Sequence, residues 1–236
     1  MLNKMNLLGA LVSASILLSG SLATATTVPF TESFDSSVEG WEDSVSNSAT
    51  FVSSGGADGG GYASTSFNYL NYFSPFGGGP VTFRASAADN ASGGAFIGDW
   101  LADGVALLTA QVRHNAPEAL NFYARVATPA NFPGAVLANA ISVPTNTWTE
   151  VSFVVSIDAP FCIGEGGPCA AANFQNVGNL QFGTDVPVGL VDDDVAYTLD
   201  LDLVTLVPVP EPGTALLMGL GLAGLSLAGR RQEVRA

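Results

Sequence analysis

The stretch Ala196–Val207, AYTLDLDLVTLV, decides the fold expected for the middle of this chain. Its three leucines, Leu199, Leu201 and Leu203, stand at every second position. In an extended chain they point to one face, and the aspartates between them point to the other. Such alternation over a short run is typical of a β-strand that buries one face. We therefore expect this segment to be the last strand of a β-sheet domain.

Nine further runs share this character. They are short, rich in β-branched and aromatic residues, and separated by clusters of Gly, Asn, Pro and Asp, which is the pattern of a sandwich. Helical periodicity is scarce between them, so the sequence predicts an all-β fold, an antiparallel and jelly-roll-like β-sandwich. The runs are Phe30–Phe34, Ala49–Ser53, Tyr62–Phe67, Val81–Ala85, Val105–Arg113, Leu120–Val126, Ile141–Val143, Thr147–Ile157 and Leu180–Gly183.

The run Thr147–Ile157 breaks the simple alternation. Trp148 does not have the same parity as Phe153, which predicts either a strand buried on both faces or a bulge near Val151. We expect Trp148 to fill the core together with Trp41, because a sandwich of this size needs large apolar side chains.

Charge is distributed unevenly along the chain. The sequence has 21 acidic and 7 basic residues, a net charge of −14, but residues 26–207 hold 19 of the acids and only three arginines, a net charge of −16. Nucleic-acid binding needs a basic face, so nucleic acid is excluded as a partner. The hydrophobic fraction of 47% excludes a disordered acidic tail. An acidic, folded domain is therefore expected.

The N-terminus has the three parts of a secretory signal peptide. Lys4 supplies a positive start, Leu7–Leu18 is an apolar run, and Ala23 and Ala25 form an Ala-x-Ala site. The sequence predicts that signal peptidase cleaves after Ala25 and removes residues 1–25. The alternative is an ordinary core helix.

The C-terminus contains a second apolar segment. No charged residue occurs from Gly213 to Gly229, and 17 helical residues at about 1.5 Å each reach the short end of a bilayer span. The basic residues that follow would hold the C-terminus in the cytoplasm and leave the acidic domain outside. A transmembrane helix at 213–229 is therefore expected.

The order of motifs in this tail resembles a known sorting signal. Pro210, Glu211 and Pro212 precede the apolar segment, and Arg230 and Arg231 follow it. This arrangement is similar to the PEP-CTERM sorting signal, here residues 208–236, which an exosortase recognises and processes in bacteria that make exopolysaccharide. The resemblance implies an exported protein, held in the inner membrane facing the periplasm and then delivered to the cell surface or extracellular matrix. A plain tail anchor is the alternative.

Four stretches of residues 26–207 resemble extracellular jelly-roll modules of the laminin-B-like and galactose-binding-like kinds, which include many carbohydrate-binding modules. The stretches are ESFDSSVEGWEDS (32–44), GGGYAS (59–64), TNTWTEVSFVV (145–155) and YTLDLDLVTL (197–206). In such modules calcium often ties the first strand to the last, and the matching acids here are Asp35 and Asp202. Calcium prefers oxygen ligands, so two carboxylates with carbonyl groups would suffice. The alternative is that both acids are solvated at strand ends.

The two cysteines are Cys162 and Cys169, separated by a glycine-rich segment. In an exported protein a disulfide between them is the expected state. Without a histidine nearby they make a poor metal site.

Catalytic signals are weak. The sequence has one histidine, His114, which is expected to be exposed in a loop, and no G-x-S-x-G motif. We therefore expect a non-catalytic surface or matrix protein without a certain cofactor. The alternative is a carbohydrate-binding module whose exposed rings, expected at Tyr69, Tyr72 and Trp100, stack on sugars. A secreted hydrolase is the remote third alternative.

Overall fold

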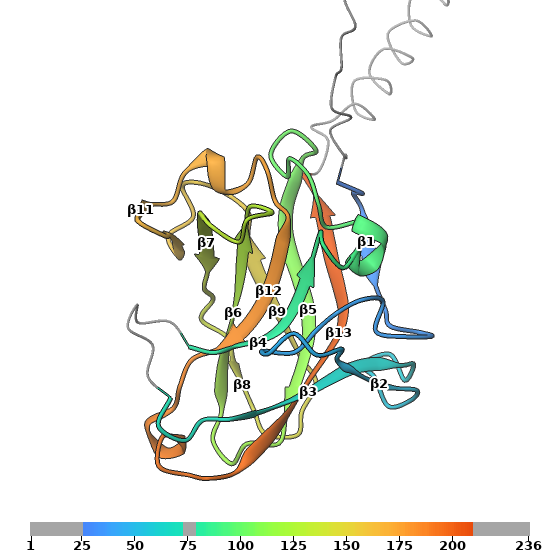
Figure 1. The fold of residues 1–236 in the computed structure, drawn as a ribbon, viewed down its shortest axis with the longest axis vertical. Helices are drawn as coiled ribbons and strands as arrows, with labels where there is room; N and C mark the ends of the chain where they lie inside the picture. Colours follow the sequence, from blue (N-terminus) through green and yellow to red (C-terminus); the bar gives the residue numbers. More distant parts are fainter. Residues whose placement is uncertain (1–25, 73–78, 210–236) are drawn as a thin grey trace, which may run out of the picture.

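The structure is a computed structural model that describes residues 26–72 and 79–209. The predicted signal peptide with Ala23 and Ala25, the transmembrane helix at 213–229, and the side chains of Pro210, Glu211, Pro212, Arg230 and Arg231 lie outside these residues. Within them, no helix has the length and apolar character needed to cross a membrane. The all-β prediction is confirmed: two antiparallel sheets face each other in a sandwich (Figure 1).

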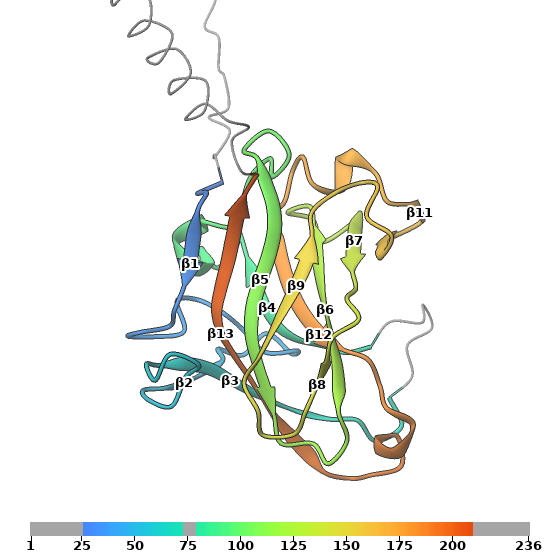
Figure 2. The ribbon, with the colours of Figure 1, turned by 180° about the vertical axis from the view of Figure 1, so that it is seen from behind.

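The first sheet, called sheet I, has the strand order β2-β3-β13-β5-β9, and β1 also pairs with β13. All of its pairings are antiparallel. Figure 2 shows β13, β5 and β9 side by side. The strands are β1 (Phe30–Glu32), β2 (Thr50–Val52), β3 (Tyr62–Asn68), β5 (Val105–His114), β9 (Thr149–Val154) and β13 (Ala196–Pro208).

The second sheet, sheet II, has the order β11-β10-β7-β6-β12-β4, and β8 pairs with the start of β6. Its strands are β4 (Val81–Ser86), β6 (Leu120–Ala127), β7 (Gly134–Leu137), β8 (Ser142–Val143), β10 (Cys162–Gly164), β11 (Gly167–Pro168) and β12 (Asn179–Thr184). Three short 3-10 helices lie in the described connections: η1 (Ala91–Gly94), η2 (Ala171–Asn173) and η3 (Val188–Leu190).

Aromatic side chains fill the space between the sheets. Phe153 of β9 and Phe182 of β12 meet across it, with ring centroids 6.1 Å apart. Trp41 is fully buried, stacks on Phe182 at 6.1 Å and donates its indole N–H to Ser92 Oγ at 2.9 Å. A buried indole needs such an acceptor. The prediction that Trp41 belongs to the core is confirmed.

A bulge in β13 changes the predicted alternation. Leu199 and Leu201 are buried as expected, but the pairing with β5 shifts between Asp202 and Thr205, and Leu203 has a φ of 46°. The extra residue of a bulge reverses the parity of everything after it. Leu203 therefore does not continue the buried row. Asp202 precedes the shift, and it is fully buried because the 55–61 loop covers it, with the N–H of Ala57 2.7 Å from its Oδ2.

All ten predicted strands are present within two or three residues at each end. The strands that the sequence did not predict are β7, β10 and β11, which together form one edge of sheet II. The predicted disulfide between Cys162 and Cys169 is confirmed, with Cα atoms 5.7 Å apart. It closes the loop that contains the β10–β11 hairpin.

The described chain begins and ends at the same end of the sandwich (Figure 1). The backbone N–H of Thr26 donates to Asp103 Oδ2 at 2.7 Å, and the N–H of Val209 donates to the carbonyl of Gly104 at 2.7 Å. One loop therefore holds both ends.

Candidate functional site

The predicted aromatic platform does not exist as a surface. Tyr69 and Trp100 are fully buried. The Tyr69 hydroxyl hydrogen-bonds Thr184 Oγ1 at 2.7 Å, and the Trp100 N–H donates to the carbonyl of Phe96 at 2.9 Å. Tyr72 is half-buried, so it is the one ring of the three with exposed surface. Buried rings cannot stack on a sugar, so the predicted platform is wrong: Tyr69 and Trp100 fill the core, and Tyr72 alone is partly exposed.

Trp148 was expected in the core but is partly exposed. Strand β9 pairs with β5 without a shift, and Val151 and Phe153 point into the core. The predicted bulge is absent from β9, and Trp148, which has the other parity, is half-buried on the outer face of sheet I. The guanidinium of Arg113 lies over its ring at 4.5 Å from the centroid, a cation–π arrangement.

Arg113 is held from several sides. Its Nε and one terminal nitrogen each lie 2.8 Å from Asp200 Oδ2, and the Tyr62 ring lies 5.0 Å from its Cζ. A cleft of about 290 Å³ borders this cluster, lined by Tyr62, Ser64, Arg113, His114, Asn115, Asn146, Thr198 and Asp200. Because the charge of Arg113 is already neutralised by Asp200, this cluster stabilises the sheet.

The two acids predicted to bind calcium lie around one glycine-rich loop. Asp202 Oδ2 accepts the N–H of Ala57 at 2.7 Å, and Oδ1 accepts the N–H of Leu203 at 2.8 Å. Burial is the main reason why the pKa of Asp202 is raised to about 6. The two amide donors lower it, and the negative charges of Asp58 and Asp35 raise it. A carboxylate with a raised pKa is one that a nearby cation would stabilise.

Glycine is required where the loop meets Asp202. A Cβ on Gly56 would lie 2.5 Å from Asp202 Oδ2 and 2.7 Å from the carbonyl oxygen of Gly61, and a Cβ on Gly60 would lie 3.2 Å from Asp35 Oδ1. The loop thus gathers carboxylate and carbonyl oxygens, the ligands that calcium prefers. Within residues 26–72 and 79–209, no three His, Cys, Asp or Glu side chains come together as a metal group. A calcium ion would therefore depend on the carbonyl oxygens as well.

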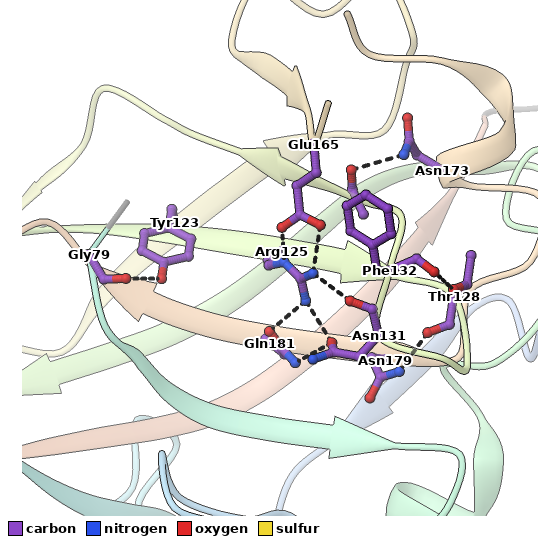
Figure 3. A network of polar contacts seen from close by, with 11 residues as sticks. Gly79, Tyr123, Arg125, Thr128, Asn131, Phe132, Glu165, Asn173, Asn179 and Gln181 are labelled. Carbon is purple, nitrogen blue, oxygen red and sulfur yellow. Dashed lines mark hydrogen bonds and ion pairs between the residues drawn. The ribbon is translucent and has the colours of Figure 1, made fainter. Parts of the chain in front are cut away.

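The outer face of sheet II carries a polar network centred on Arg125 (Figure 3). Arg125 Nε and Nη2 donate to the two oxygens of Glu165 at 2.5 and 2.8 Å. Nη1 donates to Asn131 Oδ1 at 2.7 Å and to Gln181 Oε1 at 2.9 Å, and Nη2 also donates to the carbonyl of Asn131 at 2.8 Å. All five donors of the guanidinium are used. The network therefore fastens the 128–133 loop and the disulfide-closed loop to the sheet.

A cleft of about 320 Å³ lies beside this network, bounded on one side by the same 128–133 loop. It is lined by Glu42, Ser46, Arg84, Ser86, Ala87, Ala88, Asp89, Pro129, Asn131 and Asn179. Arg84 and Glu42 exchange backbone hydrogen bonds at 2.9 Å, but their side chains form no ion pair. Arg84 Nε is buried and has no hydrogen-bond partner among the described residues. Arg84 thus forms no ion pair and donates no side-chain hydrogen bond within the described residues. Against the raising effect of burial, its positive charge adds to the effect of the Asn47 and Val45 amides in lowering the pKa of Asp43.

Residues 208–232 match the PEP-CTERM protein-sorting motif. The chain carries a PEP-CTERM sorting signal. The motif implies an exported protein processed by an exosortase, and it starts at Pro208, the last residue of β13. The PEP-CTERM signal thus follows the sandwich without a linker.

Other comparisons concern the sandwich. In solved structures it resembles the CBM22-1–GH10 modules of xylanase 10B from Clostridium thermocellum, complexed with xylohexaose: TM-score 0.45, 18% identity, 77% of this chain and 28% of that chain. It also resembles an exo-β-agarase: TM-score 0.47, 9% identity, 77% of this chain and 26% of that one. The PEP-CTERM chain thus spans about a quarter of the length of each. A comparison with curated proteins finds no match.

The single histidine of the PEP-CTERM protein is not an exposed loop residue, as the sequence had suggested. His114 ends β5, is 1% exposed, and its Nε2 hydrogen-bonds the carbonyl of Val143 at 2.9 Å. Burial lowers its pKa, so the ring is neutral at physiological pH. It borders the cleft beside Arg113 with almost no exposed surface of its own.

Sequence reasoning missed Arg84, Arg125 and Trp148 as residues of interest. One signal for the arginines was available. Residues 26–207 contain only three basic residues and 19 acids, and this scarcity indicates that each arginine has a specific role. The parity mismatch of Trp148 with Phe153 was also visible, and an outward-facing ring explains it without a bulge.

Proposed function

We propose that this chain is an exported, exosortase-sorted, non-catalytic protein of the cell surface or extracellular matrix of an exopolysaccharide-producing bacterium. The observation that carries the proposal is the PEP-CTERM motif at residues 208–232, directly after the last strand of a β-sandwich. The strongly acidic domain, with a net charge of −16 over residues 26–207, suits a soluble surface outside the cell.

The proposal includes removal of residues 1–25 by signal peptidase. Cleavage after Ala25 would turn the N–H of Thr26 into an ammonium group, 2.7 Å from the Asp103 carboxylate, where an ion pair would form. Thr26 is 7% exposed, and its hydroxyl donates to the carbonyl of Ile97 at 3.2 Å. A buried, bonded Thr26 is consistent with a chain that starts there. Because both ends leave the sandwich at one loop, the precursor would be tethered to the inner membrane through that end.

A non-catalytic role is supported by the environment of the histidine. His114 is 1% exposed and its Nε2 is hydrogen-bonded to the carbonyl of Val143, so it is poorly placed to act as a general base on an external substrate. The acids that are exposed near the glycine-rich loop, Asp35 and Asp58, have backbone or hydroxyl partners.

We also propose that calcium binds where Asp35 and Asp202 approach the 55–61 loop. The support is the oxygen-only donor set and the buried carboxylate of Asp202. Calcium would stabilise the tie between this loop and β13. Adding calcium to chelator-treated protein should raise its melting temperature, and an Asp202→Asn variant should lose that response. A melting temperature that does not change when calcium is added would contradict the proposed calcium site.

Carbohydrate binding is the second candidate function. It is favoured by polar clefts of about 290 and 320 Å³ on the outer faces of the two sheets. Small-molecule sites are clefts of about 300–1,000 Å³ that combine apolar walls with a few convergent polar groups. Surface or matrix attachment and glycan binding are compatible, since a matrix protein can be held by the polysaccharide around it.

The experiment that tests the main proposal changes the sorting motif. Pro210, Glu211 and Pro212 are replaced together by alanine in the native host, and the size and location of the protein are followed. We expect unprocessed protein to accumulate in the membrane fraction. A matched control replaces Pro187 by alanine, a proline in the sandwich and outside the motif. Normal processing of the triple variant would contradict the proposal.

A further inference from the structure

We propose that the cleft beside Arg84 on the outer face of sheet II is a binding site for a neutral saccharide. This assignment rests on the proposed surface role and names the ligand class that would serve it. It replaces the exposed rings expected from the sequence with a different set of residues, on a different part of the sandwich.

The first observation is that Arg84 lacks an ion-pair partner. Residues 26–207 contain three arginines. Arg113 is neutralised by Asp200, and Arg125 is neutralised by Glu165. Arg84 forms no ion pair with a described residue, and its Nε is buried without a partner. Arg84 as a whole is only half-buried and lines the cleft, and its terminal nitrogens donate to no described residue. These nitrogens are the donors that a ligand oxygen in the cleft could meet.

The second observation is the set of groups around it that are free to bond a ligand. Asn131 uses its Oδ1 and its backbone carbonyl to accept from Arg125, and no described residue accepts from its Nδ2. Asn179 donates its Nδ2 to the carbonyl of Thr128 at 2.7 Å, and no described residue donates to its Oδ1. The side-chain carboxylate of Glu42 likewise has no hydrogen-bond partner in the described part of the chain. The cleft thus offers both donors and acceptors.

Charge decides between a neutral and an acidic ligand. Glu42 and Asp89 line the cleft with Arg84, so its formal charge is negative. The domain as a whole carries a net charge of −16, which also repels anions. An acidic sugar or a phosphate would meet this negative charge, whereas the hydroxyl groups of a neutral sugar can accept from Arg84 and donate to Glu42. A hydroxyl is both donor and acceptor, which fits this mixed set.

Apolar groups complete the site. Pro129, Ala87 and Ala88 line the same cleft and offer contact to the C–H groups of a sugar ring. The loop that carries Pro129 and Asn131 is fixed by the Arg125 network (Figure 3). The wall of the cleft is therefore formed before a ligand arrives, which limits the entropy lost on binding.

The test is affinity electrophoresis of the full chain, kept in a non-glycosidic detergent, through gels that contain soluble polysaccharides. The neutral probes are xylan, mixed-linkage β-glucan, agarose and galactomannan, and the acidic probes are alginate and polygalacturonate. The variants are Arg84→Gln and Arg84→Lys. The matched control is Gln175→Glu, which lowers the net charge by one, as Arg84→Gln does, at an exposed position away from the cleft.

We expect at least one neutral polysaccharide to retard the wild-type chain. Arg84→Gln should weaken this binding by about tenfold or more, as expected for loss of a hydrogen bond from a charged group. Arg84→Lys should restore only part of it, because lysine lacks the planar fork, and Gln175→Glu should bind normally. Melting temperatures close to the wild-type value would show that the variants fold.

Three results would overturn the assignment: no retardation by any neutral probe, retardation by acidic probes only, or retardation that Arg84→Gln leaves unchanged. These results are separable from failure of the proposed sorting role, because binding is measured on purified protein and sorting is measured by processing in the host.

Discussion

Arg125 and Arg84 lie on the same outer face of sheet II and have opposite surroundings. Arg125, on β6, makes five hydrogen bonds and an ion pair with Glu165. Arg84, on β4, has a buried Nε without a partner and forms no ion pair with a described residue. In a domain with 19 acids and three arginines, an unpaired arginine is not explained by a shortage of carboxylates.

The difference distinguishes charged residues that stabilise the fold from charged residues that are available to bind a ligand. A charge whose bonding capacity is filled by the chain itself contributes to stability, and its removal should unfold the region around it. A charge that forms no ion pair within the protein contributes little to its stability, and it can be retained for another reason, such as binding. Asp202 belongs with Arg84 in this respect, since it is a fully buried carboxylate without a basic partner among the residues described.

The largest effect is expected for Arg125→Ala. It leaves Glu165 and Asn131 without their partner and releases two loops, so the free energy of unfolding should fall by about 3 kcal/mol. Urea denaturation monitored by tryptophan fluorescence measures this. Arg125→Lys should lose most of the same stability, because one ammonium cannot replace five directed donors. A loss below 1 kcal/mol would mean that the network is a surface arrangement, and the contrast with Arg84 would disappear.

The next effect concerns the pH dependence that Asp202 produces. Burial, first, and the charges of Asp58 and Asp35, second, raise its pKa from 3.8 to about 6, against the lowering effect of the Ala57 and Leu203 amides. Between these values the folded state binds more protons than the unfolded state. Stability contributed by this group is therefore present at the acidic end and decreases as the pH rises from about 4 to about 6, by about 1–3 kcal/mol.

Chelator-treated wild-type protein and Asp202→Asn should be compared by thermal melting across this pH range. The difference between them should change with pH in the chelator and become nearly constant in calcium, because a bound cation keeps the carboxylate ionised. A difference that is independent of pH in the chelator would show that Asp202 does not resist ionisation.

A somewhat smaller effect is expected from the disulfide. Cys162 and Cys169 close the loop that carries Glu165, the partner of Arg125. Replacing both cysteines by serine should cost at most about 2.5 kcal/mol, because the closed loop is short. If the disulfide positions Glu165, combining this change with Arg125→Ala should cost less than the sum of the two, which a double-mutant cycle measures. Full additivity would show that the two features act independently.

The smallest effect on stability is expected for Arg84→Ala. Since Arg84 has no partner to lose, the free energy of unfolding should change by less than about 0.5 kcal/mol, in contrast with Arg125→Ala. Urea denaturation under the same conditions allows the change in the free energy of unfolding to be compared directly with that of Arg125→Ala. A loss comparable to that of Arg125→Ala would show that Arg84 is structural.

Much of the fold was predictable because alternation in strands such as β13 and β5 is a local property of the sequence. The strands β7, β10 and β11 were not, because glycines, prolines and the cysteine loop conceal them, and their pairing depends on β6. The bulge at Leu203 was also hidden, since it appears only when β13 pairs with β5.

The candidate site was less predictable than the fold. The sorting motif could be read directly because its function depends on contiguous residues. The rings Tyr69 and Trp100 were misjudged because their burial is decided by packing against residues far away in the sequence. Whether Arg84 has a partner depends on residues of several strands and loops, which no local pattern records.

The claim that the chain is exported and sorted is tested most directly by the termini of the mature protein. Mass spectrometry of protein recovered from the cell surface and medium of the native host would identify both ends. We predict an N-terminus at Thr26 and a C-terminus within or near Pro210–Pro212, with the apolar segment and the arginines removed. Mature protein that still begins at Met1 and ends at Ala236 would contradict the claim.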